Sequence, residues 1–249
     1  MATEHSGSGD HVRTVELLWG IRPEPKRGPK PGMTIEQITR AAIEIADAEG
    51  IAALSMRAVA KRLDVGTMSL YRYVPSKAEL LDVMLDAVLA EVGPATDADG
   101  GWRDQLEFAA WEDWRLAHRH PWMLSVGQSR QVTGPNGLRR FEAILRVLAG
   151  TGLPPQRVVD VAELLGSYVE GAARKSVDLV EVERRTGLTQ DQWWLTIGSQ
   201  AYDQVDWSSY PTVVRISQHD VFGFPPERHF AEGLRLVLDG IAADIAAVT

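Results

Sequence analysis

Hydrophobic residues recur every three or four positions along almost the whole chain, and no stretch shows the two-residue alternation of a half-buried strand. This pattern predicts a mainly helical protein, so the expected fold class is all-α. A short apolar run at 12–21 predicts a local helix packed on the body. The main helices are expected at 34–50, 55–64, 67–74, 76–92, 102–120, 138–149, 155–185 and 226–247. The pattern is less regular between 187 and 226, where 190–202 is expected as helix and 203–211 as loop.

The stretch SMRAVAKRLDVGTMSLYRYVPSK, residues 55–77, predicts two short helices joined by a tight turn. Ser55 is expected to cap the first helix, and Gly66 offers the turn a residue that tolerates positive φ. Thr67 is expected to cap the second helix, which Pro75 prevents from continuing. This is the spacing of a helix-turn-helix, in which the second helix enters the major groove of DNA.

The second of these helices is expected to bury Leu70 and Val74 and to turn polar side chains outward. Hydroxyl, phenol and guanidinium groups are suited to phosphate oxygens and base edges. The candidate DNA contacts are Thr67, Ser69, Tyr71, Arg72, Tyr73 and Lys77.

The run from 34 to 81 resembles the DNA-binding domain of the tetracycline-repressor (TetR) family of transcriptional regulators. The segments TIEQITRAAIEIADAEG and LSMRAVAKRLDVGTMSLYRYVPSKAELL carry the resemblance. Asp64 stands where the family usually has glycine before the turn, and aspartate also tolerates the left-handed region. The resemblance implies a ligand-responsive repressor that binds a palindromic operator as a homodimer, with Tyr71 and Lys77 mainly on phosphates.

Three later segments, HPWML, GPNGLRRFEAILRVLAGTGL and SYVEGAA, resemble the carboxy-terminal inducer-binding domain of one branch of the family. We therefore expect three parts: a disordered, basic extension at 1–33, a helix-turn-helix domain with its connecting helix at 34–92, and a ligand-binding and dimerisation domain at 93–249. The Gly-, Ala- and Asp-rich stretch 93–101 is the expected boundary.

Charge is distributed unevenly along the chain. The net charge of the 249 residues is −8, yet 13–77 holds 11 Lys and Arg against 7 Asp and Glu, whereas 78–249 holds 15 against 25. A basic front on an acidic body favours approach to DNA in one orientation. The absence of cysteine excludes disulfides and thiolate zinc sites.

The segment RPEPKRGPKPG, residues 22–32, predicts an extended basic arm that reaches DNA through Arg27 and Lys30. A solvated linker is the alternative. Residues 1–11 are small and polar and are expected to be disordered. With neither a signal pattern nor an 18-residue apolar run, we expect a cytoplasmic protein without a membrane partner.

Aromatic residues recur on one face of the helix at 102–120 and again near 193. Such a stripe either fills the core or lines a cavity for an apolar or aromatic ligand. The inducer-domain resemblance favours the cavity and adds two aromatic residues from the segments that carry it. The candidate ligand contacts are Phe108, Trp111, Trp114, His118, Trp122, Phe141, Tyr168, Trp193 and Trp194.

Glu163 and Glu170 share a helix face with Arg174. Glu170 and Arg174 have the spacing of an ordinary surface ion pair. The alternative is that Glu163 or Glu170 faces the cavity and favours a cationic or hydroxylated ligand.

Small residues form rows on two helices, with Gly166 and Ala173 on one and Gly233, Gly240 and Ala247 on the other. Glycine inside a helix costs about 1 kcal/mol relative to alanine, so the rows indicate close approach of helices. In the family that the chain resembles, such helices form a four-helix dimer interface. Packing within one subunit is the alternative.

The sequence lacks G-x-S-x-G, Walker A, H-E-x-x-H and a G-x-G-x-x-G that follows a strand. His118 and His120 lie two apart on a helix and are poor joint metal ligands. We therefore expect no enzyme, no catalytic residue, no metal ligand and no cofactor. The alternative to a repressor is a helical protein that sequesters a small molecule without binding an operator.

Overall fold

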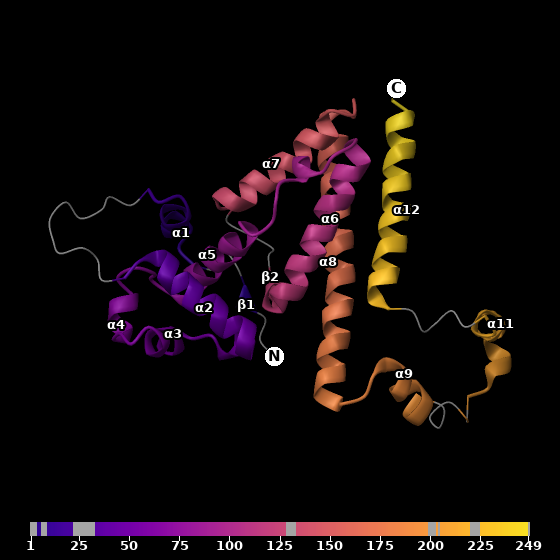
Figure 1. The fold of residues 1–249 in the computed structure, drawn as a ribbon, viewed down its shortest axis with the longest axis horizontal. Helices are drawn as coiled ribbons and strands as arrows, with labels where there is room; N and C mark the ends of the chain where they lie inside the picture. Colours follow the sequence, from indigo (N-terminus) through magenta and orange to yellow (C-terminus); the bar gives the residue numbers. More distant parts are fainter. Residues whose placement is uncertain are drawn as a thin grey trace.

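The computed structural model describes residues 4–5, 9–21, 33–127, 133–198, 203, 205–219 and 225–248. Figure 1 shows a small helical unit on the amino-terminal side and a larger one built on long helices. The expectation of an all-α fold is confirmed. Apart from helices, the described residues form only one two-residue parallel pairing, between β1 (Glu4–His5) and β2 (Val126–Gly127).

The small unit contains α2 (Ile35–Glu49), a 3-10 turn η1 (Ile51–Ala53), α3 (Met56–Arg62), α4 (Thr67–Leu70) and α5 (Lys77–Leu89). It is preceded by α1 (His11–Leu18). The larger unit begins with η2 (Ala95–Asp97), α6 (Trp102–Arg119), η3 (Pro121–Ser125), α7 (Pro135–Ala149) and α8 (Pro155–Thr186). It continues with α9 (Gln190–Trp193), a π turn η4 (Trp194–Gly198), η5 (Trp207–Ser209), α11 (Pro211–Ser217) and α12 (Pro226–Ala246).

Local caps set several of these helix starts. Thr34 and Gln37 form a capping box at α2, with hydrogen bonds of 3.2 and 2.9 Å. Ser55 caps α3 by accepting from the Ala58 backbone N–H at 3.1 Å. These bonds satisfy N–H groups that have no partner within the helix, which explains why the sequence located both starts correctly.

The helix-turn-helix differs from the prediction at its turn. The left-handed residue is Asp64, with φ of 54°, whereas Gly66 has φ of −69° and serves as the N-cap of α4. Thr67 is therefore the first helical residue and not the cap. Helix α4 ends at Leu70, earlier than the predicted residue 74, and residues 71–73 form a turn. Val74, the residue before Pro75, is disfavoured in the helical region.

Each unit buries its own apolar cluster. In the small unit the fully buried side chains include Ile38, Leu54, Leu70, Leu80 and Met84. The cluster of the larger unit is centred on Leu106, Leu148, Phe230, Leu234 and Leu238.

The first cluster also takes in Leu116, Trp122 and Val126, which follow the expected domain boundary. The end of α6 and the η3 turn are thus packed directly into the small unit. The two units are therefore held together by shared core as well as by the chain that joins them.

The amino-terminal segment packs on α5. Leu17 and Leu18 of α1 form a small apolar cluster with Val83, and Thr14 donates to the Asp82 carboxylate at 3.5 Å. The composition predicts disorder for residues 1–11, but residues 4–5 pair with 126–127 and α1 begins at 11. This segment is ordered by contacts with α5 and with residues 126–127, which are distant in the sequence, and local composition does not show such contacts.

In the irregular region α9 continues as the π turn η4 to Gly198, in agreement with the helix expected at 190–202 as far as the described residues reach. Helix α11, which begins at Pro211, was not predicted. Among the described residues no helix is long and apolar enough to cross a membrane.

Replacing Asp64 with alanine should lower the free energy of unfolding by about 1 kcal/mol, because a Cβ without a local polar group is disfavoured at positive φ. Asp64→Gly and Asp64→Asn should not lower it. Urea denaturation at one protein concentration measures all three variants. Equal stability of the alanine and glycine variants would show that the turn stores no such strain.

Candidate functional site

The candidate DNA-binding surface is built on α4 and the turn that follows it. Leu70 and Val74 are fully buried and anchor this segment to the core. Tyr71 is 42% exposed and Arg72 is also exposed, whereas the other four candidates, Thr67, Ser69, Tyr73 and Lys77, are half-buried. The segment therefore presents hydroxyl, phenol and cationic groups to solvent from a fixed backbone.

Met68 is a member of this surface that the sequence reasoning missed. Its side chain is 77% exposed, although methionine is usually buried. In a major groove, an exposed apolar side chain is suited to contact with thymine methyl groups. The signal was available in the sequence, because Met68 lies between two residues predicted to face outward. The two arm candidates, Arg27 and Lys30, lie outside the described residues.

A partly open cavity of about 670 Å³ lies where the larger unit meets α5, and it is bounded by α5, α6, α7 and α8. Its volume is in the range of about 300 to 1,000 Å³ that small-molecule sites occupy. Most of the wall is apolar: Leu85, Leu89, Ala109, Ala110, Met123, Leu138, Phe141, Ile144, Ala162, Leu165 and Val169. The polar and glycine part of the wall is Asp113, Thr133, Gly137, Arg140, Glu163, Gly166, Ser167 and Glu170.

Asp113 and Arg140 form an ion pair on the cavity wall. Arg140 also donates to the Ala109 carbonyl at 3.0 Å. Burial raises the pKa of Asp113, and the neighbouring Arg140 opposes this shift. The carboxylate still has a third of its side-chain surface accessible because it faces the cavity.

Only one of the predicted ligand contacts, Phe141, lies on this wall. Four others form a separate aromatic cluster at the junction of α6, α8 and α12. Trp111 and Trp114 pack on Phe230 with ring centroids 4.7 and 4.3 Å apart. His118 lies 4.5 Å from Trp114 and is fixed by the Ser176 hydroxyl, 2.9 Å from its Nε2.

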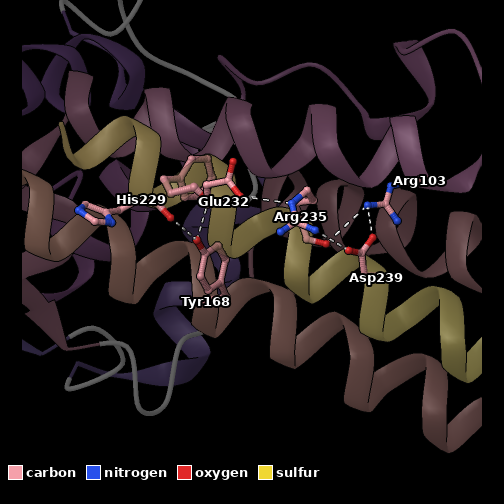
Figure 2. A network of polar contacts seen from close by, with 7 residues as sticks. Arg103, Tyr168, His229, Glu232, Arg235 and Asp239 are labelled. Atoms are coloured by element: carbon pink, nitrogen blue, oxygen red, sulfur yellow. Dashed lines mark hydrogen bonds and ion pairs between the residues drawn. The ribbon is translucent and has the colours of Figure 1, made fainter. Parts of the chain in front are cut away.

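Tyr168 belongs to the same cluster and points from α8 to α12 (Figure 2). Its hydroxyl donates to the Phe230 carbonyl at 2.6 Å. A Cβ at Gly233 would collide with this hydroxyl, so the glycine allows the two helices to approach. At this position packing within one subunit explains the small residue.

Figure 2 also shows polar contacts along α12 that continue to α6. The Arg235 guanidinium donates to the Asp239 carboxylate at 2.9 Å, and Arg103 of α6 donates to the same carboxylate at 2.7 Å. These contacts and the aromatic cluster together hold α6, α8 and α12 against one another.

The remaining aromatic candidates lie elsewhere. Trp122 is buried in the core of the small unit. Trp193 and Trp194 are 37% and 46% exposed in the excursion between α8 and α12. Phe108 is half-buried and does not line the cavity. The structure thus brings Trp111, Trp114, His118 and Tyr168 together, but apart from the cavity.

A polar junction joins the two units. His120 is 4% exposed and lies between two carboxylates, with Nδ1 2.7 Å from Asp47 of α2 and Nε2 3.2 Å from Glu91. Trp122 donates to the same Asp47 oxygen at 2.7 Å. Partial burial acts to raise the pKa of Glu91, but Arg119 and His120 outweigh it, and the pKa lies below its usual value.

A second junction joins α5 to α7. The Asp86 carboxylate accepts from the backbone N–H groups of Asn136 and Gly137 at 3.1 and 2.9 Å. The Asn136 side chain donates back to the Asp86 carbonyl at 3.0 Å. Asp86 therefore caps α7, the helix that carries Phe141 on the cavity wall, from a position on the connecting helix.

No cluster of three or more His, Asp or Glu side chains that could hold a metal ion occurs among the residues described. The two histidines of the α6 region are each committed to the polar contacts given above.

The small unit presents an exposed recognition segment, which consists of α4 and the turn after it. Helix α5 connects this unit to a larger helical unit that contributes to a cavity. This arrangement is typical of a helix-turn-helix regulator with a ligand domain. The comparisons agree. Residues 38–84 match the model of bacterial regulatory proteins of the tetR family, and residues 94–245 match the tetracyclin repressor-like C-terminal domain.

Two curated proteins are similar over nearly the full length. The HTH-type transcriptional repressor DrrR1 of Streptomyces coeruleorubidus is 46% identical over 98% of this chain and 90% of its own. An HTH-type transcriptional regulator of Saccharopolyspora erythraea is 32% identical over 91% of both chains. The chain belongs to the TetR family of transcriptional regulators, which are not enzymes.

Solved structures show the same fold. ActR of Streptomyces coelicolor in complex with actinorhodin superimposes with a TM-score of 0.71 at 27% identity, covering 86% of this chain and 97% of ActR. ActR in complex with (S)-DNPA gives a TM-score of 0.68 at 26% identity, covering 88% and 100%.

Replacing His120 with alanine should lower the free energy of unfolding by about 1 to 3 kcal/mol, because carboxylates in the junction lose their partner. Thermal or urea unfolding followed by circular dichroism measures the loss. Arg146→Ala is the control, since its pair with Glu142 is exposed and should contribute less than about 1 kcal/mol. A His120 variant no less stable than this control would show that the junction adds no net stability.

Proposed function

We propose that the protein is a ligand-responsive transcriptional repressor. It binds a palindromic operator as a homodimer and is released by a small, mainly apolar or aromatic molecule. Similarity to the repressor DrrR1 supports repression, and the ActR complexes support a small-molecule site in this fold. Such a protein works in the cytoplasm, where a bacterial chromosome is accessible.

The observation that carries the proposal is the position of Leu85. This residue of α5 is 1% exposed within the core of the DNA-binding unit, and it also lines the cavity. Leu89, one turn later, lines the cavity as well. A ligand in the cavity therefore touches the same helix that supports the recognition segment.

The candidate DNA contacts are the six residues of the α4 region together with Met68, and Arg27 and Lys30 of the arm. Exposure of Met68 and Arg72 on one segment supports base contact, whereas Tyr71, which is also exposed, and Lys77 at the start of α5 are suited to phosphate. The alternative, a sequestering protein without operator binding, accounts for the cavity but not for this surface.

The dimer is proposed to form through α8 and α12, which lie side by side at one edge of the larger unit (Figure 1). Both carry exposed apolar side chains, including Leu164 at 52%, Val180 at 56% and Leu236 at 62%. A Cβ added at Gly171 or Gly240 would meet no atom within 4 Å, which leaves room for a partner helix. A twofold dimer matches a palindromic operator.

The switch is proposed to act through α5. A ligand can act on α5 directly, by displacing Leu85. It can also act through α7, because a shift of α7 is passed to α5 by the hydrogen bonds between Asp86 and Asn136. In either case α5 tilts and moves the recognition segment attached to it. Two recognition segments must match major grooves about 34 Å apart, so a small tilt in each subunit weakens operator binding.

Loss of Arg72 and loss of Lys77 should weaken operator binding in different ways. Arg72→Ala should cost about 1 to 3 kcal/mol and relax preference at one base position, because a base contact is lost. Lys77→Ala should weaken all sequences and lower the salt slope by about one, because a phosphate contact is lost. Gel-shift titrations with the DNA upstream of the protein's own gene measure both.

Arg215→Ala is the control, since this exposed arginine lies on the distant α11. Two chains should bind each operator, as sedimentation of the complex will show. No shift by the wild type would leave the sequestering protein as the function.

Ligand and operator should antagonise each other reciprocally, with a coupling of about 1 to 3 kcal/mol. Two titrations of a compound that quenches tryptophan fluorescence, with and without operator, measure the coupling. Asn136→Ala should reduce it, because this variant removes side-chain hydrogen bonds between α5 and α7. Identical ligand affinity in both titrations would show that the cavity does not control DNA binding.

A further inference from the structure

The charges on the cavity wall are not balanced. The wall carries three carboxylates, those of Asp113, Glu163 and Glu170, and one guanidinium, that of Arg140. With Arg174, which pairs with Glu170, the net formal charge is −1. Asp113 is half-buried and Glu163 and Glu170 are exposed, so solvent screens only part of the interaction of these charges with a ligand in the cavity. The sign of the wall charge therefore discriminates among ligands with the same apolar body.

The guanidinium of Arg140 is already committed. It is paired with Asp113, donates to the Ala109 carbonyl at 3.0 Å, and has 13% of its side-chain surface accessible. Bringing an anion to Arg140 would break a pair on the cavity wall and leave Asp113 without its partner, which is costly. The wall is thus unsuited to a carboxylate or sulfonate ligand.

Glu163 is the carboxylate that remains available. It shares one stripe of α8 with Gly166, Ser167 and Glu170, because residues three, four and seven apart lie on the same helix face. Glu170 is bonded to Arg174 at 2.7 Å. Among the residues that the structure describes, Glu163 has neither an ion pair nor a hydrogen-bonded side-chain partner.

Gly166, one turn from Glu163, also lines the cavity. Gly166 lies within a 32-residue helix, where glycine costs about 1 kcal/mol relative to alanine. A Cβ at this position would meet no atom within 4 Å, so no neighbouring helix of the same chain requires the glycine. Because Gly166 has no side chain, the cavity wall has open space one turn from the Glu163 carboxylate.

We propose that the inducer is an amphipathic cation, an apolar ring system that carries a protonated amine. The inference rests on the proposed function, because it assumes that the cavity is the inducer site. The ring body lies against Leu85, Phe141 and Ile144, and the amine faces Glu163 over the space left by Gly166. Glu163 is therefore the specificity-determining residue.

Three fluorescent anthracenes of nearly equal size test the inference: 9-(aminomethyl)anthracene, 9-anthracenemethanol and anthracene-9-carboxylate. Their dissociation constants for the full-length protein should rank ammonium, alcohol, carboxylate. The ammonium should bind about tenfold more tightly than the alcohol, as one charge-assisted contact allows. Glu163→Gln should bring this ratio close to one.

Glu107→Gln is the matched control and should keep the ratio, because Glu107 is exposed on α6 and does not line the cavity. Gly166→Leu fills the open space and should abolish binding of all three probes. Circular dichroism of each variant confirms that it is folded.

The possible failures are distinguishable. If the alcohol or the carboxylate binds wild type as tightly as the ammonium, while Gly166→Leu abolishes binding, the cavity remains the ligand site and the cation preference is overturned. A ratio that survives Glu163→Gln also overturns the assignment of Glu163. If none of the probes binds, or if binding survives Gly166→Leu, the inducer site of the proposed function and the cation inference both fail.

Discussion

Burial of α5 on all sides is the constraint on which the rest of the structure depends. Its apolar residues fill the core of the DNA-binding unit, and Val83 packs against α1. Three acidic residues of the helix are buried too, and each has found a partner: Glu79 accepts from the Asp10 N–H, Asp82 from Thr14, and Asp86 from α7. No buried side-chain polar atom of the described residues lacks a hydrogen bond. Because buried carboxylates need such partners, α5 is tied both to α1 with its N-cap residue and to α7, and it cannot shift without moving them.

This constraint gives the small unit its dependence on the larger one. Helix α4 has four residues, too few to be stable alone, so its orientation comes from Leu70, Val74 and the core that α5 completes. The His120 junction and the packing of Trp122 add a second attachment, between α6 and α2. A displacement that begins at the cavity wall thus has two routes to the recognition segment, one through α5 and one through the end of α6.

Charge is also divided between the two parts of the chain. The basic excess lies in residues 13–77, which include the helix-turn-helix, and the acidic excess lies in residues 78–249, where part of it lines the cavity. The fold is shared with ActR, but the fold alone does not choose a ligand. In this protein we attribute the choice to the few polar residues on an otherwise apolar wall, above all Glu163.

The sequence by itself determined the helices, the helix-turn-helix and the family. Capping at Thr34 and Ser55, burial of Leu70 and Val74, and the tolerance of Asp64 for positive φ are local properties, fixed by residues close in the chain.

Tertiary structure alone decided which aromatic residues line a cavity. Periodicity shows which face of a helix is buried, but whether that face meets a neighbour or a cavity depends on how the helices pack. For this reason Trp111 and Trp114 joined the core against Phe230, 116 residues beyond Trp114, whereas Phe141 reached the cavity. The pairing of His120 with Asp47 across 73 positions was hidden for the same reason, because no local pattern specifies a partner that only the packing of two units brings within reach.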